Sequence, residues 1–236
     1  MNYTIRRTMA IFQKDYKDMM KNLYVSTTIV LPLIMAAFYG RTGVDTVDGY
    51  FLVFNMTFSV VAAYIQASLI AEEKEKNTLR GLMLSPASTG EIMAGKSLLS
   101  FVSTVIILFI SAIFMRFQPA DPAIIVTALV ISTFFYIALG TLLGLVTRSV
   151  MEASVAILPV LLFFSFAPFA TVFMDEYPIL KIAEYLPNLQ LVELGAAVEA
   201  GGGFEDVWSN LLILISWTAA LLVAVVVMYQ KKMIDK

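Results

Sequence analysis

The sequence predicts an all-α, polytopic membrane protein with six transmembrane helices, an N-terminal interfacial amphipathic helix, and both termini in the cytoplasm. Of its 236 residues, 59% are hydrophobic and 14% are charged, whereas an average soluble domain carries about 25% charged residues. The apolar residues gather in six long runs, and Lys and Arg favour one set of the connections between them. We therefore expect residues 1–236 to form a single membrane domain.

The composition also argues against several function classes. The chain has no cysteine and no histidine, which excludes disulfides, thiolate chemistry and the usual haem and zinc sites. The apolar runs carry no charged residue in their interiors, although proton- or ion-coupled carriers usually keep an ionisable group at membrane depth. Without His or Cys, and without a carboxylate inside a span, most hydrolytic and metal-dependent mechanisms are excluded. We expect no catalytic, cofactor-binding or metal-binding residues on this chain.

Residues 1–22 predict a basic amphipathic helix. Apolar residues recur at steps of three and four, and basic residues occupy the rest of the helical surface. The apolar positions are Ile5, Met9, Phe12, Tyr16, Met19, Met20 and Leu23, and the basic ones are Arg6, Arg7, Lys14, Lys17 and Lys21. Such a helix just before a membrane span is expected to lie in the interfacial plane. A soluble core helix is the alternative, but the chain offers no soluble domain for it.

Six apolar runs follow, and each approaches the roughly 17–25 residues that a helix needs to cross a bilayer. They are Leu23–Tyr39, Tyr50–Ile70, Ser97–Met115, Ala123–Val146, Ala153–Phe173 and Leu211–Tyr229.

The distribution of Lys and Arg predicts the orientation of these spans, because cytoplasmic loops are enriched in both. With six spans, one side holds Arg6, Arg7, Lys14, Lys17, Lys21, Lys74, Lys76, Arg80, Lys96, Arg148, Lys231, Lys232 and Lys236. The other side holds Arg41, Arg116 and Lys181. The termini and the loop 71–96 are therefore predicted to be cytoplasmic.

The longest outer connection, residues 175–210, is acidic and partly helical in pattern. Its apolar residues recur at near-helical spacing between Pro178 and Ala200, with a break at Pro187. We expect two short helices near the membrane surface, followed by a glycine-rich turn at 201–203. Its acidic residues could attract a cationic substrate, although a solvated face is the simpler interpretation.

The loop 71–96 contains a pattern that is typical of nucleotide binding. Gly90–Ser97 reads G-x-x-x-x-G-K-S, which binds phosphate when it follows a buried strand and opens a helix. Here Ser88 and Glu91 form a capping box that would begin a helix at about Thr89, so the backbone amides would be used within the helix. A nucleotide-binding fold also needs roughly a hundred residues. We therefore expect no ATP binding here, and we assign Lys96 to a positively charged anchor at the foot of the third span.

The first half of the loop predicts a charged helical extension of the second span. Glu72 and Glu73 are spaced to pair with Lys76 at i,i+4 and i,i+3. A small apolar face follows at Leu79, Leu82 and Met83. Ser85-Pro86 then stops the helix, because the residue before proline is pushed out of the helical region. Composition alone leaves two interpretations open, a docking element or a solvated loop resting on lipid headgroups.

This segment resembles the signature of type-2 ABC transporter membrane subunits. The matching positions are Glu73, Glu75, Thr78, Leu79, Leu82, Ser85 and Pro86, with Gly95 and Lys96 opening the next span. A second resemblance covers Pro168, Tyr177-Pro178, Leu186-Pro187 and Glu193. The amphipathic start is similar to the interfacial helix of the family. Asn77 and Arg80 depart from the family pattern, which often has glycine and an acidic residue there.

The resemblance implies the permease subunit of an ABC exporter in the cytoplasmic membrane of a prokaryote. A separate ATP-binding subunit, carrying ATP and Mg²⁺, would drive alternating access in a homo- or heterodimer of permease chains, with no nucleic-acid partner. The coupling segment would contact that subunit through Glu72, Glu73, Glu75, Thr78, Leu79, Leu82, Met83, Ser85 and Pro86. An ATP-independent channel and a membrane assembly factor are the alternatives.

The resemblance also implies that the second and fifth spans face the transport pathway. The candidate pathway-lining residues are Asn55, Ser59, Gln66, Pro159, Ser165 and Pro168. Polar residues in a span also commonly join neighbouring helices, so both interpretations stay open. No motif indicates the substrate.

Overall fold

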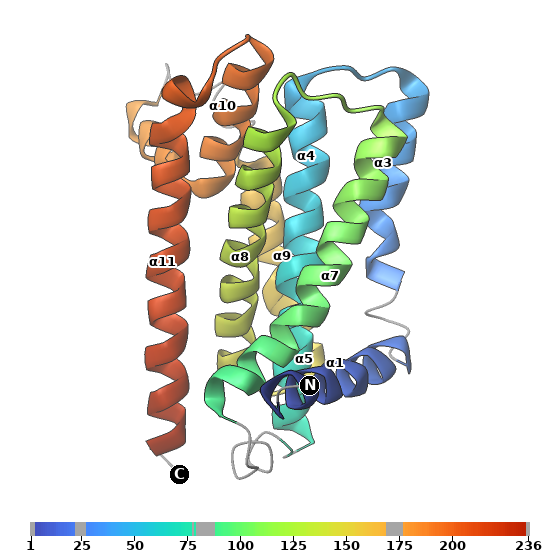
Figure 1. The fold of residues 1–236 in the computed structure, drawn as a ribbon, viewed down its shortest axis with the longest axis vertical. Coiled ribbons are helices and arrows are strands. Elements are labelled where there is room, and N and C mark those ends of the chain that lie inside the picture. Colours follow the sequence, from blue (N-terminus) through green and yellow to red (C-terminus); the bar gives the residue numbers. More distant parts are fainter. Residues whose placement is uncertain (1–2, 22–26, 77, 79–87, 169–176, 235–236) are drawn as a thin grey trace.

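The computed structural model describes residues 3–21, 27–76, 78, 88–168 and 177–234. In this part of the chain all regular structure is helical (Figure 1). The α-helices are α1 (Tyr3–Lys21), α3 (Val30–Thr42), α4 (Val47–Thr57), α5 (Tyr64–Glu75), α7 (Thr89–Met115), α8 (Pro122–Val146), α9 (Val150–Phe166), α10 (Pro187–Glu199) and α11 (Phe204–Ile234). A π-helical segment, η1 (Phe58–Ala63), joins α4 to α5, and a 3₁₀ helix, η3 (Pro178–Tyr185), precedes α10.

The long helices lie side by side, and α1 lies across one end of the bundle (Figure 1). The C-terminal end of α11 lies at this same end, whereas η3 and α10 lie at the other. This arrangement agrees with the predicted placement of both termini on one side of the membrane. That this side is cytoplasmic stays a prediction.

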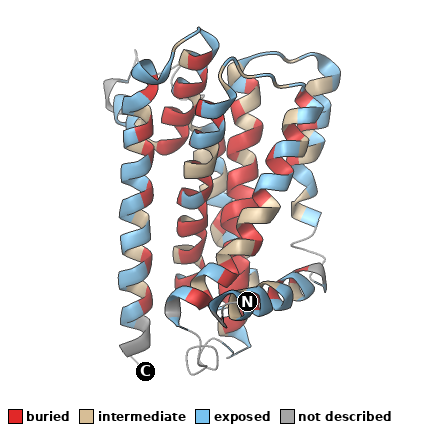
Figure 2. Ribbon diagram, in the orientation of Figure 1, coloured by how far each residue is buried: buried red, intermediate tan, exposed pale blue. Residues whose placement is uncertain are grey.

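The second predicted span is the centre of the bundle. It comprises α4, η1 and α5, and nearly all of its apolar residues are buried within this single chain, whereas most of those of α11 are not (Figure 2). Glycines let α8 approach it closely, because a Cβ atom on Gly140 would lie 2.2 Å from the carbonyl oxygen of Ala63 and one on Gly144 2.7 Å from that of Ala67. Small residues at such crossings are typical of helix packing in membranes.

Four helical segments in the described residues are long and apolar enough to cross a membrane. They are Val47–Glu75, Gly90–Met115, Pro122–Val146 and Phe204–Lys231. The first and fifth predicted spans correspond to the shorter apolar helices α3 and α9, and both predicted spans also include residues outside the described ranges. The chain is thus a multi-pass membrane protein, and its six-span count stays a prediction.

The capping box predicted at the start of the third span is confirmed. The Ser88 Oγ atom accepts a hydrogen bond from the Glu91 backbone N–H at 3.2 Å, and the Glu91 carboxylate accepts one from the Ser88 N–H at 2.8 Å. The helix α7 therefore begins at Thr89, and Gly90–Ser97 is helical throughout. The geometry of a phosphate-binding loop is absent from this segment.

The outer connection contains two short helical elements that meet at Pro187, where the sequence pattern breaks. The first, η3, is a 3₁₀ helix, and the second, α10, is α-helical with proline in its first turn. Proline is tolerated there because the first N–H groups of a helix have no intrahelical partner.

Candidate functional site

Three successive residues at the end of α5 connect it to four other helices. Glu73 binds side chains of α1 and α7, Lys74 binds the end of α8, and Glu75 binds the start of α9. We call this set of contacts the α5 junction. It immediately precedes the interval 79–87, which lies outside the described residues and carries most of the predicted docking segment.

Glu73 lies at the centre of the α5 junction. Its carboxylate is 3.1 Å from the Lys96 Nζ atom and also pairs with Lys14, and it accepts a hydrogen bond from the Thr78 hydroxyl. The side chains of Glu73 and Lys96 are 3% and 1% exposed. A charge buried to this degree is costly unless it is paired and hydrogen-bonded, and these partners offset that cost.

Asp15 of α1 completes a group of two acids and two bases, in which Asp15, Glu73 and Lys96 are buried and the Lys14 side chain is 46% exposed. The Lys96 Nζ atom lies 3.3 Å from its carboxylate, and the Lys14 Nζ atom lies 3.7 Å from it. Burial raises the pKa of Asp15, although the neighbouring charges of Lys96 and Lys14 oppose this effect. Burial acts to lower the pKa of Lys14, but its hydrogen bond with Glu73 and the charges of Glu73, Asp15 and Asp18 together raise the pKa.

A close approach of α1 to α7 brings these charges together. A Cβ atom on Gly95 would lie 2.8 Å from the Ile11 Cβ atom and 3.2 Å from the Thr8 carbonyl oxygen. Glycine at this position therefore lets α1 lie directly on α7, where Lys96 can reach Asp15. Arg7 and Glu91 form a second connection between the two helices, at 3.5 Å.

Lys74 and Glu75 bind the facing ends of α8 and α9. The Lys74 Nζ atom donates to the carbonyl oxygens of Leu145, at 2.7 Å, and Thr147, and a cation near the last carbonyls of a helix is favourable. The Glu75 carboxylate accepts a hydrogen bond from the Val150 backbone N–H at 2.9 Å, and an anion at a helix N-terminus is likewise favourable. The end of α5 thus fixes the connection between α8 and α9.

The structure describes four of the predicted docking residues and corrects two predictions about charges. Glu72, Glu73, Glu75 and Thr78 are described, whereas Leu79, Leu82, Met83, Ser85 and Pro86 lie outside the described residues. The Glu72–Lys76 pair is confirmed. The predicted Glu73–Lys76 pair is wrong, because Glu73 turns inward to Lys14 and Lys96. The interfacial role assigned to Lys96 is also wrong, because its side chain is buried among acids.

The predicted amphipathic helix is present as α1, and its position in the membrane interface stays a prediction. Against the rest of the chain, the helix buries Ile11, Asp15 and Met19, at steps of four. Ile5, Met9 and Tyr16 of the predicted apolar stripe are exposed. Sequence reasoning missed Asp15 because it sought an apolar face. The spacing of Asp15, four residues after Ile11 and four before Met19, is the signal that could have placed it on the buried face.

The candidate pathway residues differ in exposure. Asn55, Ser59, Gln66 and Ser165 are buried inside this chain, Pro168 is half-buried, and Pro159 is exposed. Gln66 joins α5 to its neighbours, donating to the Thr141 hydroxyl at 3.0 Å and accepting from the Ser100 hydroxyl at 2.8 Å. The pathway-lining role stays a prediction.

Within the described residues, no group of three or more His, Cys, Asp or Glu side chains is placed to hold a metal ion.

Comparison with known families gives one match. A family model described as "ABC-2 family transporter protein" matches residues 19–227. The match runs from the end of α1 into α11, so it includes the α5 junction except for Lys14, and it also leaves out Asp15. Among curated proteins, none matches the chain.

Proposed function

The chain belongs to the ABC-2 transporter family as a permease of that type, and we propose that it is the membrane subunit of an ATP-driven exporter whose α5 junction transmits the movement of a separate ATP-binding subunit. That subunit would bind ATP and Mg²⁺. Two permease chains, identical or different, would alternate access to the substrate between the two sides of the cytoplasmic membrane.

The observation that carries this proposal is the attachment of both ends of the interval 79–87. On one side, Thr78 donates to Glu73, which is paired with α1 and α7. On the other side, Ser88 and Glu91 form the capping box of α7, and Glu91 pairs with Arg7 of α1. A partner that pushes on this interval would therefore move α1, α5 and α7 together.

The same push would reach the two helices that follow in the chain. Because Lys74 binds the end of α8 and Glu75 binds the start of α9, a displacement of α5 would move this connection as well. Direct hydrogen bonds and ion pairs between rigid helices are suited to carry such a displacement.

We propose that the chain itself hydrolyses no ATP. The Gly90–Ser97 segment uses its backbone amides inside α7, beyond the capped first turn. Its two characteristic residues have structural roles, since Gly95 contacts α1 and Lys96 is paired with Asp15 and Glu73. The match to a phosphate-binding pattern is therefore explained without nucleotide.

Affinity purification of the tagged chain from its own membranes tests the proposed function. We expect a protein with nucleotide-binding motifs to co-purify, and ATP hydrolysis to disappear when the catalytic residues of that protein are substituted. Hydrolysis by the permease alone would overturn the proposal. Solute flux through vesicles that contain only this chain, without nucleotide, would favour the alternative of an ATP-independent channel.

A further inference from the structure

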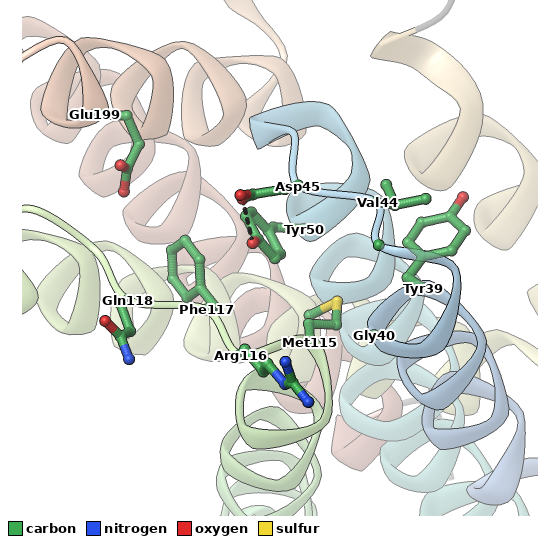
Figure 3. A pocket seen from close by; sticks show the side chains of 11 residues that line it. Tyr39, Gly40, Val44, Asp45, Tyr50, Met115, Arg116, Phe117, Gln118 and Glu199 are labelled. Carbon is green, nitrogen blue, oxygen red and sulfur yellow. Dashed lines mark hydrogen bonds between the residues drawn. The ribbon is translucent and has the colours of Figure 1, made fainter.

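A cavity of about 410 Å³ lies at the end of the bundle opposite α1 (Figure 1), and Figure 3 shows its lining from close by. Its walls come from the ends of α3 and α7, the start of α4 and the last residue of α10. The α5 junction lies at the other end, so this cavity is separate from the proposed coupling contacts. Its volume falls within the range of small-molecule sites, roughly 300–1,000 Å³.

Two left-handed helix ends shape this cavity. The helix α3 ends at Gly43 with φ of 73°, and α7 ends at Arg116 with φ of 56°. Glycine is the usual residue in this conformation because it has no Cβ atom. Arg116 is the one non-glycine residue with positive φ in the described part of the chain. A strained position that is occupied by a charged residue beside a cavity points to a role for that side chain.

Three charged side chains from separate elements line the cavity. Asp45 follows α3, Glu199 ends α10 and Arg116 ends α7 (Figure 3). The Asp45 carboxylate accepts a hydrogen bond from the Tyr50 hydroxyl at 2.7 Å. Among the ion pairs of the described residues, none within 4.0 Å joins Arg116 to either acid. The charges are therefore set apart around the cavity.

Aromatic rings complete the lining. Tyr39, Tyr50 and Phe117 face the cavity, and the rings of Tyr50 and Phe117 are in contact with centroids 4.7 Å apart. Aromatic faces beside carboxylates are typical of sites for ammonium groups. A guanidinium, in turn, is suited to carboxylate and phosphate.

We propose that this cavity binds a small zwitterion that carries an ammonium group and a carboxylate or phosphate group. The ammonium group would contact Asp45, Glu199 and the tyrosine rings, and the anionic group would contact Arg116. A free solute and a phospholipid headgroup both present this chemistry.

Titration of the purified chain with O-phosphoethanolamine in a non-ionic maltoside detergent tests the proposal, with saturation-transfer NMR as the readout. We expect binding that exceeds that of ethanolamine and of glycerol 3-phosphate, each of which carries one of the two charged groups. The substitutions D45N and R116Q should each raise Kd by about tenfold, as expected for the loss of a charged contact.

Two matched substitutions at the same end of the bundle serve as controls. Glu205 and Arg41 are exposed and do not line the cavity, so E205Q and R41Q should leave Kd unchanged. Thermal unfolding establishes that all four variants are folded. Absence of binding, equal binding of ethanolamine, or equal effects of the cavity and control substitutions would overturn the proposal.

A lipid comparison identifies the source of the zwitterion. Binding of O-phosphoethanolamine is measured in nanodiscs of phosphatidylglycerol, with and without phosphatidylethanolamine. If phosphatidylethanolamine displaces the soluble probe from the wild-type chain, the site takes a lipid headgroup. If the probe remains bound, the site takes a free solute. Both results support a zwitterion site, which the detergent titration establishes.

Discussion

At the scale of single residues, Lys96 links the sequence pattern to the function. It occupies the lysine position of a pattern associated with phosphate, yet its side chain is 1% exposed and lies between two carboxylates. The resulting group alternates acid and base, with Lys14 and Lys96 balancing Asp15 and Glu73. The packing of α1 on α7 buries three of these side chains, Asp15, Glu73 and Lys96, so each of the three depends on its paired charge.

The substitution Lys96→Gln is expected to destabilise the protein strongly. It leaves Asp15 and Glu73 with Lys14 as their remaining base, and removing one partner of a buried pair costs about 3–5 kcal/mol. The matched control Lys76→Gln removes the exposed pair with Glu72, for which a loss below about 1 kcal/mol is expected. Denaturant unfolding in detergent measures both variants. Equal losses would contradict the buried ion group.

At the scale of the helices, two kinds of contact determine the arrangement. Glycines let neighbouring helices pack closely, and charged side chains of α5 bind the ends of α8 and α9. Gly95 lets α1 lie on α7, and Gly140 and Gly144 let α8 lie on the second span. Lys74 and Glu75 bind the ends of α8 and α9. The α5 junction is therefore bound to its neighbours, which is the property that the proposed coupling role requires.

The pair Gly95→Ala and Gly90→Ala tests the packing of α1 on α7. A Cβ atom on Gly95 would clash with Ile11, whereas one on Gly90 would meet only the Ser88 Oγ atom, at 4.0 Å. We expect Gly95→Ala to cost about 1–2 kcal/mol through overpacking. Gly90→Ala should be neutral or slightly stabilising, since alanine favours the helix. Thermal unfolding followed by circular dichroism compares them, and a similar loss in both variants would argue against a close α1–α7 contact.

At the scale of the whole molecule, local patterns predicted the helical architecture well. Apolar runs indicated the spans, and Ser88 with Glu91 predicted the start of α7, because capping is decided by residues three positions apart. Long-range pairing was not predictable in this way. Lys96 and Asp15 are 81 positions apart, and nothing local distinguishes a buried lysine from one at a membrane surface.

The same limit applies to the functional residues. Family resemblance indicated Glu73, Glu75 and Thr78 as candidate coupling residues, which stays a prediction, and it did not indicate that Lys74 binds the end of α8. The face of α1 that packs on the rest of the chain was not predicted, because Asp15 lies within it and pairs with the distant Lys96. The outer cavity escaped sequence reasoning because Asp45, Arg116 and Glu199 come from three separate elements.

The most direct test of the coupling role is photocrosslinking from the segment that follows the α5 junction. The chain has no native cysteine, so Leu79→Cys can carry a benzophenone label without background, and Gln118→Cys, beside the outer cavity, serves as the control. In membranes of the native host we predict that Leu79→Cys forms an adduct that mass spectrometry identifies as the ATP-binding subunit, whereas Gln118→Cys forms none. Absence of this adduct, or equal yields from both positions, would contradict the coupling role of the segment.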